Sequence, residues 1–402
     1  MELKLEDIEK AAIRLEEVIH ETPLERSNTF SKMSKSDLYL KYENQQKTGS
    51  FKIRGAYNKI ATLMETEKPK AVIASSAGNH AQGVAFAAST LGMKATIVMP
   101  RSTPIAKIAA TEEYGAEVVL HGNCYDEAYA KANEISKQTG AVFIHPFNDV
   151  DVMAGQATIG LEILRSLPTV DVVCVPAGGG GILAGVACCL KSINPRIKVI
   201  GVQAEGAPAI CNSFKDKKLC FTDYVQTIAD GIAVKEPGNL TVELINKYVD
   251  EIVTVSDNEI ASTILLLLER TKQVVEPAGA VTLAAAINRK FDIKGKKVAC
   301  ILSGGNIDVS FIHKIIERGL IARGRQMKFK TVMPDIPGSL ERFSRILAQE
   351  DANIVLFQHD RLNADLEINE AIIHVACELL SKEHGKRLMT RLKKEGYKVM
   401  TD

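Results

Sequence analysis

One lysine stands where a strand-to-helix turn could hold it against a cofactor. Lys52 follows a Gly-Ser turn and is flanked by Phe51 in the segment SFKIRG, residues 50–55. Partial burial disfavours the ammonium form of a lysine, so that a neutral, nucleophilic amine becomes accessible. A carbonyl cofactor held as a Schiff base needs such an amine. A surface lysine at an ordinary helix start is the alternative interpretation of the same residues.

A second segment places small residues before an amide side chain. Ser76, Ala77, Gly78, Asn79 and His80 lie between an apolar run and a helix-forming run. The first N–H groups of a helix have no partner within the helix and attract anions such as a carboxylate, and small residues let a ligand come close. We therefore expect this loop to bind the substrate. The alternative is that Asn79 only caps the helix and that His80 is structural.

A third loop consists of four consecutive glycines. Gly178, Gly179, Gly180 and Gly181 directly follow the apolar run VVCVPA. Such a run is costly in chain entropy inside a strand, but between a strand and a helix it forms a nest of N–H groups that fits a phosphate. The loop lacks the Lys-Ser/Thr of a Walker A motif and is not a clean G-x-G-x-x-G fingerprint. A tight turn without a ligand is the alternative.

A later apolar run ends in Ser303, whose hydroxyl would project from a strand end. The four segments together suit one ligand, with its phosphate in the glycine nest, its aldehyde near Lys52 and its ring nitrogen near Ser303. That ligand is pyridoxal 5′-phosphate (PLP). No segment alone indicates it, and the prediction depends on their combination.

Short apolar strands alternate with amphipathic helices around these loops. Continuously apolar strands separated by helices predict a parallel sheet that is buried on both faces. Ligands of such sheets bind beyond the carboxyl ends of the strands, where the four segments lie. The predicted strands cover 37–43, 71–75, 94–100 and 117–122 and resume at 170 and 198, and the predicted helices cover 1–20, 81–92, 104–115 and 126–140.

The C-terminal part of the sequence, from about residue 327, predicts a different order of helices and strands. A Gly/Arg-rich joint at 318–326 precedes elements in the order β-α-β-β-α-β, which is the ferredoxin-like unit. We therefore predict a catalytic domain over 1–322 and a separate domain over 327–402. Within the first, a small subdomain of about 50–150 is inserted into the large one.

Composition excludes several classes of protein. The chain has 402 residues, with 50 Lys+Arg against 49 Asp+Glu, and this balance argues against a nucleic-acid-binding surface. No apolar run reaches the ~18 residues that cross a membrane, and the charged N-terminus is not a secretory signal. The eight cysteines show no disulfide or zinc spacing. We expect a cytoplasmic protein with buried, reduced thiols and no metal.

The motifs resemble the fold-type II PLP enzymes, whose two parallel-sheet subdomains are those of the tryptophan synthase β-subunit, and among them the serine/threonine dehydratases. The resemblance covers most of residues 20–320. It rests on TPL at 22–24, KYENQ at 41–45, SFKIRGA at 50–56, SAGNHAQG at 76–83, GQATIGLEI at 155–163, the tetraglycine, ADGIAV at 229–234, EPAGA at 276–280 and LSGGN at 302–306.

The resemblance implies a role for each site residue. Lys52 would hold the cofactor and remove the substrate's α-proton, with Phe51 packed beside the cofactor. Asn79 would bond the cofactor's 3′-oxygen, and Ser303 would bond the pyridine nitrogen. The tetraglycine, with Ile182, would hold the phosphate.

The implied activity is that of a threonine ammonia-lyase, which converts L-threonine to 2-oxobutanoate and ammonia and L-serine to pyruvate. A serine or threonine racemase on the same fold is the closest alternative. Related racemases carry a second acid/base, a serine, where this chain has Ala77. Their divalent-metal site is only partly matched, because Glu205 fits but Cys211 falls where an aspartate is expected. A non-catalytic amino-acid sensor and a β-replacement enzyme are more distant alternatives.

The tail resembles an ACT domain, a module that commonly receives an amino-acid effector. This likeness implies allosteric control, with isoleucine or valine as the first candidate effector, and a homodimer or homotetramer. The same domain could serve assembly alone. Isoleucine biosynthesis and threonine catabolism both fit the activity. The regulatory turn consists of Asp335, Ile336, Pro337, Gly338, Ser339 and Leu340.

Overall fold

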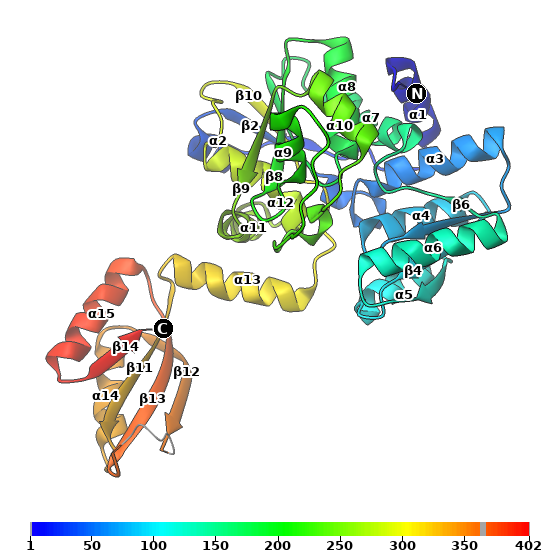
Figure 1. Ribbon diagram of the computed structural model, residues 1–402. Coiled ribbons are helices and arrows are strands. Elements are labelled where there is room, and N and C mark those ends of the chain that lie inside the picture. The colour runs from blue at the N-terminus through cyan, green and yellow to red at the C-terminus, as the bar shows by residue number, and fades with distance from the viewer. Residues whose placement is uncertain (1, 362–366, 402) are drawn as a thin grey trace. The chain divides into compact units, whose positions relative to one another are not determined.

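The computed structural model describes residues 2–361 and 367–401, which fold as two compact units, Met1–Ile307 and Asp308–Asp402 (Figure 1). The first unit contains two separate sheets, and the second contains one. The predicted site residues, other than those of the regulatory turn, belong to the first unit.

The larger sheet of the first unit has six strands in the order β1-β2-β10-β7-β8-β9. All its neighbours pair in parallel except β1, which runs antiparallel to β2 at one edge. Strand β7 is buried along its whole length, as the apolar run predicted. The strands are β1 (Leu24–Arg26), β2 (Asp37–Lys41), β7 (Val172–Pro176), β8 (Lys198–Ala204), β9 (Glu251–Val255) and β10 (Lys297–Ile301).

Helices cover this sheet, and a large apolar core lies between the helices and the sheet. Helices α7 and α8 pack closely on each other. Gly185 of α8 makes this approach possible, because a Cβ there would lie 2.4 Å from the Met153 carbonyl oxygen of α7. The helices are α1 (Leu5–Leu15), α2 (Asn28–Ser34), α7 (Val150–Ser166), α8 (Gly181–Ile193), α9 (Ala209–Asp216), α10 (Asn239–Tyr248), α11 (Asp257–Thr271) and α12 (Pro277–Ile287).

The smaller sheet has four parallel strands in the order β5-β4-β3-β6. Its alternation of strands and helices confirms the predicted parallel sheet, and β3 spans the five residues assigned from the sequence. Its elements are β3 (Ala71–Ser75), β4 (Lys94–Met99), β5 (Glu117–Leu120) and β6 (Val142–Phe143) with α3 (Lys52–Thr66), α4 (Asn79–Thr90), α5 (Ile105–Glu113) and α6 (Tyr125–Thr139). Short 3₁₀ turns, η1 (Glu43–Gln45), η2 (Lys47–Gly49) and η3 (Asp230–Ile232), lie near the loops of the site.

The second unit begins with α13 (Val309–Ala322) and continues as an antiparallel sheet of four strands in the order β12-β13-β11-β14. The predicted β-α-β-β-α-β order is confirmed. Phe343, fully buried, lies at the centre of its aromatic core. The remaining elements are β11 (Gln326–Pro334), α14 (Ser339–Gln349), β12 (Asn353–Asp360), β13 (Glu370–Glu378), α15 (Lys382–Lys394) and β14 (Lys398–Thr401).

Three expectations need correction. The joint predicted at 318–326 is largely regular, because α13 runs to Ala322 and β11 starts at Gln326, and Gly324, with φ of +68°, makes the turn between them. The first helix spans only Leu5–Leu15 of the predicted 1–20, since Ile8, Ala11 and Leu15 are the residues that it buries. Of the eight cysteines, none in a disulfide, Cys124 is exposed and Cys220 half-buried.

Across the described part of the chain, no helix combines the length and the apolar character that crossing a membrane requires.

Candidate active site

The lysine loop and the Ser303 loop are joined by backbone hydrogen bonds. The Phe51 N–H donates to the Ser303 carbonyl oxygen at 3.1 Å, and Ser50 forms an isolated antiparallel bridge with Gly304. Lys52 is the first residue of α3, as the Gly-Ser turn predicted. Two segments far apart in the sequence are thus held side by side where β10 ends.

Lys52 is half-buried, and its surroundings favour the neutral amine. Its Nζ donates to the Pro146 carbonyl oxygen at 3.1 Å and lies 5.3 Å from the centroid of the Phe51 ring. Burial lowers the pKa of Lys52 to about 8, against the opposing effect of the nearby Glu276 carboxylate. About a tenth of such an amine is neutral at pH 7, whereas an ordinary lysine has almost none.

The carbonyl that accepts from Lys52 belongs to a loop that the sequence reasoning missed. His145 Nδ1 accepts the N–H groups of Phe147 at 3.3 Å and Asn148 at 2.9 Å, and this arrangement holds the loop after β6 in place. Burial lowers the pKa of His145 to about 4, so its ring stays neutral and can accept. The signal was the short apolar run AVFI at 141–144, which leads into a loop at the carboxyl end of a parallel strand, but the strand itself has only two residues.

The Asn79 side chain reaches into the site and does not cap α4. Gly78 is the N-cap, and the Asn79 side chain is engaged elsewhere. Asn79 Nδ2 donates to Glu276 Oε1 at 2.7 Å, and Asn79 Oδ1 accepts from Asn306 Nδ2 at 2.7 Å. A Cβ on Gly78 would meet no atom within 4 Å, so this loop faces open space that a ligand can enter.

The other residues of the Asn79 loop differ in which groups they present to a ligand. Ser76 Oγ accepts the Gly78 N–H at 3.2 Å, and Ala77 is half-buried. The His80 ring is buried and lies 2.9 Å from the Ile144 carbonyl oxygen, and burial lowers the pKa of His80 to about 3. The His80 side chain is therefore engaged away from the loop, and only its backbone N–H remains for a ligand.

The tetraglycine forms the buried start of α8. Gly180, with φ of +96°, is the N-cap, a left-handed conformation that glycine adopts without strain. No side chain fits at Gly179, because its Cβ would lie 2.4 Å from the Phe147 ring. The first N–H groups of α8 have no acceptor within the helix and are buried, so they need an anion or another acceptor. Ile182 lies in this first turn and is buried.

Comparison with known proteins shows the family to which this sequence belongs. The family described as pyridoxal-phosphate dependent enzyme matches residues 15–304. The chain belongs to this family. It is 51% identical over 397 residues to the L-threonine ammonia-lyase of Thermotoga maritima, which covers 99% of both chains.

Solved structures give the same fold. The processed form of threonine deaminase isoform 2 from Solanum lycopersicum has a TM-score of 0.75 and 40% identity over 78% of this chain and 86% of its own. Maize serine racemase has a TM-score of 0.75 and 34% identity over 80% of this chain and 98% of its own. The first unit is therefore a fold-type II PLP enzyme with two parallel-sheet subdomains.

The residues present fit the family's cofactor. Lys52 provides an amine of lowered pKa, and the start of α8 provides buried N–H donors for a phosphate. Ser303 is 2% exposed, and its Oγ lies 3.5 Å from the Ala278 carbonyl oxygen, a long hydrogen bond that leaves the hydroxyl able to bind a ring nitrogen.

Glu276 is a second residue that the sequence reasoning did not assign. It precedes Pro277 at the start of α12 and is buried, with only 8% of its surface exposed. Burial and, next, the Asp230 carboxylate raise the pKa of Glu276 to about 7. The motif EPAGA contained the signal for this residue, since a buried acid just before a helix needs a hydrogen-bonding or charged partner. The sequence does not show that this partner is Asn79.

A buried network of charges fixes α3, and with it Lys52. The Arg54 guanidinium lies 2.8 Å from Glu43 Oε1 and 2.5 Å from Glu162 Oε1. Lys41 Nζ lies 2.5 Å from Glu162 Oε2. Two cations and two anions thus compensate each other where β2, η1, α3 and α7 meet.

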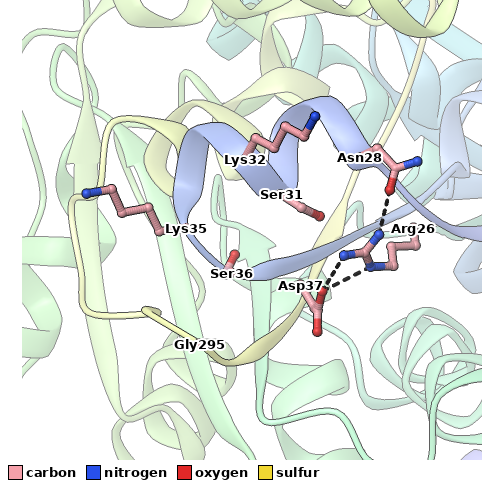
Figure 2. A pocket seen from close by; sticks show the side chains of 8 residues that line it. All are labelled: Arg26, Asn28, Ser31, Lys32, Lys35, Ser36, Asp37 and Gly295. Carbon is pink, nitrogen blue, oxygen red and sulfur yellow. Dashed lines mark hydrogen bonds and ion pairs between the residues drawn. The ribbon is translucent and has the colours of Figure 1, made fainter.

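A surface pocket of about 330 Å³ lies apart from these loops (Figure 2). Arg26 lines the pocket, where it pairs with Asp37 at 2.5 Å and donates to Asn28 Oδ1 at 2.6 Å (Figure 2). None of its lining residues belongs to the site described above. The lining consists of Arg26, Asn28, Ser31, Lys32, Lys35, Ser36, Asp37 and Gly295.

No group of three or more His, Cys, Asp or Glu side chains that could hold a metal ion occurs within residues 2–361 and 367–401. Glu205 lies 3.9 Å from Lys290 Nζ, and Cys211 is buried. The prediction that the enzyme uses no metal stays a prediction.

Proposed function

We propose that the chain is a PLP-dependent threonine ammonia-lyase, a lyase that converts L-threonine to 2-oxobutanoate and ammonia, and that it also converts L-serine to pyruvate. The observation that carries the proposal is Lys52, an amine of lowered pKa at the meeting point of the site loops. A chain 51% identical over nearly its whole length has the same activity in its name.

The chain's own residues divide the work of the reaction. PLP, when bound, supplies the electron sink that makes loss of the α-proton possible. The neutral Lys52 amine accepts the α-proton of the substrate. The β-hydroxyl takes up one proton as it leaves as water, so that the α-proton and the hydroxyl together account for the water lost. The released enamine then hydrolyses to keto acid and ammonia.

The remaining predicted residues would bind and orient the cofactor and the substrate. Gly178 to Gly181 and Ile182 would hold the phosphate through the N–H groups at the start of α8, and Phe51 would pack beside the ring. Ser303 would face the pyridine nitrogen, and Asn79 would bond the 3′-oxygen. The substrate carboxylate would bind the loop Ser76 to His80 at the start of α4, with His80 contributing its backbone N–H only.

Racemisation of serine or threonine is the second candidate, because maize serine racemase shares the fold at 34% identity. It needs a second acid/base on the face of the substrate opposite Lys52. Ala77 stands where related racemases carry that group and cannot exchange a proton. Chiral analysis of recovered substrate decides between them: keto acid should form faster than D-threonine or D-serine.

For the second unit we propose a ferredoxin-like ACT domain over 327–402, with the catalytic domain over 1–322 and its small subdomain over about 50–150. In support, Asp335 at the start of the turn pairs with Arg361, whose Nη2 lies 3.1 Å from Asp335 Oδ1, and His359 Nε2 lies 3.8 Å from the same oxygen. An amino-acid effector would bind along this turn, formed by Asp335, Ile336, Pro337, Gly338, Ser339 and Leu340.

We also propose a homodimer or homotetramer. Strand β12 is an edge of its sheet and exposes the apolar side chains of residues 354–357. An edge with unpaired backbone groups and exposed apolar residues is suited to a second copy of the chain. Feedback by isoleucine or valine would connect the enzyme to isoleucine biosynthesis, and absence of feedback would fit threonine catabolism.

A further inference from the structure

The Asn79 amide is the middle member of a chain of hydrogen-bonded side chains drawn from three segments. We propose that Glu276 and Asn306 are positioning residues that fix the orientation of this amide, so that one Asn79 N–H bond is left pointing into the site toward the cofactor. The proposal rests on the proposed function only in taking Asn79 as a cofactor contact. Neither partner was assigned a role from the sequence.

The donor and acceptor directions along these hydrogen bonds are set at the end where Asn306 meets a backbone carbonyl group. The Thr48 carbonyl oxygen can only accept, so the group of Asn306 at 2.8 Å from it must be the NH₂ group. The same NH₂ group donates to Asn79 Oδ1 at 2.7 Å and has a longer contact of 3.5 Å with Gln82 Oε1. With its oxygen turned to Asn306, Asn79 presents its own NH₂ group to Glu276 Oε1 at 2.7 Å.

This arrangement leaves one hydrogen of Asn79 uncommitted. An amide NH₂ group has two hydrogens, and Glu276 takes one of them. If the amide were rotated by 180°, two NH₂ groups would face each other at Asn306, and at Glu276 the amide oxygen would face the oxygens of the ionised carboxylate. The reversed state is therefore strongly disfavoured, and the donor that remains has one direction.

Both partners are held by close packing against the backbone of site loops. Glu276 donates its backbone N–H to the Gly304 carbonyl oxygen at 3.0 Å, and a Cβ on Gly304 would lie 2.4 Å from Glu276 Oε1. Gly49, with φ of +70°, leaves no room for a side chain beside the Asn306 amide. The chain of hydrogen bonds thus connects the Lys52 loop, the Asn79 loop and the Ser303 loop.

The orienting role can be separated from the charge of Glu276. Asp230 of η3, Lys107 of α5 and Lys52 of α3 all act on this carboxyl group, so a change of charge would be felt around the site. To accept the hydrogen bond from the Asn79 NH₂ group, residue 276 needs only a side-chain oxygen, which a glutamine also provides. Glu276→Gln therefore keeps the orientation and removes the charge, whereas Glu276→Leu removes both.

The test measures PLP affinity and the absorbance band of the bound cofactor in full-length protein, together with thermal unfolding of the PLP-free form. We expect Glu276→Leu and Asn306→Asp to weaken PLP binding about tenfold and to shift the band, by analogy with losses of outer partners at other sites. In Asn306→Asp the carboxylate cannot donate to Thr48 or to Asn79. Glu276→Gln should bind PLP within about twofold of wild type with an unshifted band.

A matched control is Glu259→Leu, which removes a glutamate that caps α11 outside the site and should leave PLP affinity unchanged. The proposal is overturned if Asn306→Asp, folded by the unfolding measurement, binds PLP like wild type. It is also overturned if Glu276→Gln loses as much affinity as Glu276→Leu, because charge and not orientation would then matter. If Glu276→Leu does not fold, Glu276→Gln and Asn306→Asp decide alone. Failure of wild-type protein to bind PLP would instead refute the proposed function.

Discussion

The amine of Lys52 is the most reactive group that the site offers, and its surroundings explain why. Its Nζ donates to the Pro146 carbonyl oxygen and lies beside an aromatic ring, so its ammonium form is poorly hydrated. Glu276 partly offsets this cost from across the site. The balance leaves an amine that can act near neutral pH, which is the requirement of an acid/base group.

The lowered pKa of Lys52, about 8, makes a pH-dependent prediction for the PLP-free protein. Because the pKa is lowered, the neutral amine is populated above about pH 8 and not only above the ~10.4 of an ordinary lysine. Acylation of Lys52 by acetic anhydride, followed by peptide mass spectrometry, should rise with a midpoint near pH 8, and Glu276→Gln should lower that midpoint. A midpoint near that of the exposed lysines in the same digest would contradict the account.

Two glycines of the site should respond differently to an added methyl group. Gly179→Ala would drive its Cβ into the Phe147 ring, 2.4 Å away, whereas Gly78→Ala meets no atom within 4 Å. In urea unfolding of the PLP-free protein, Gly179→Ala should cost about 1–3 kcal/mol, the usual range for overpacking, and Gly78→Ala should cost less. Equal losses from the two substitutions would show that Phe147 yields freely.

At the scale of elements, α3 carries the buried ion pairs of Arg54, two residues after Lys52. Arg54 is fully buried between two carboxylates. The pair Arg14–Glu65, by contrast, is partly exposed, with 22% and 56% of the two side chains accessible. Burial decides how much each arginine contributes.

Arg54→Met would leave Glu43 and Glu162 with only Lys41 to compensate them. We expect a loss of about 3–5 kcal/mol in the free energy of unfolding, as for a broken buried pair. The matched Arg14→Ala should cost no more than about 1 kcal/mol. Chemical denaturation of both variants measures the difference, and similar small losses for both would mean that the buried network does not hold α3.

The elements show how far the sequence alone could predict the structure. Local apolar runs located β3 and the helix after it, and the glycines and Ser303 marked loops that the fold does bring to strand ends. Glu276 and the Pro146 carbonyl were missed because their partners are distant in the chain. The joint predicted at 318–326 is shorter than expected, because Gly319 lies inside α13 and Gly324 makes the turn before β11.

For the whole molecule, the two compact units differ in architecture, since the first contains two mainly parallel sheets and the second an antiparallel sheet of four strands. The turn from Asp335 to Leu340 starts α14, whose first N–H groups could bind the carboxylate of an effector. The change in element order near residue 320 predicts a second domain, and the control proposed for that domain rests on its resemblance to an ACT domain. Effector binding at the turn is the part of this proposal that can be measured directly.

If the second unit is regulatory, isoleucine or valine should change the L-threonine dependence of the full-length enzyme. Asp335→Ala removes the acceptor that holds Arg361 and should abolish the effect while leaving uninhibited turnover within about twofold, since it lies outside the catalytic loops. The measurement is initial rate against L-threonine with and without each amino acid. Inhibition that survives the substitution would place the effector elsewhere.

The central claim, that Lys52 carries threonine deamination, is tested most directly by 2-oxobutanoate release from L-threonine by PLP-loaded protein. Wild type and Lys137→Ala, which alters an exposed lysine of α6, should both turn over, and borohydride should attach the cofactor to Lys52. Lys52→Ala should lose at least about a hundredfold in turnover, the scale of a missing acid/base group. Turnover by Lys52→Ala at the wild-type rate would contradict the account.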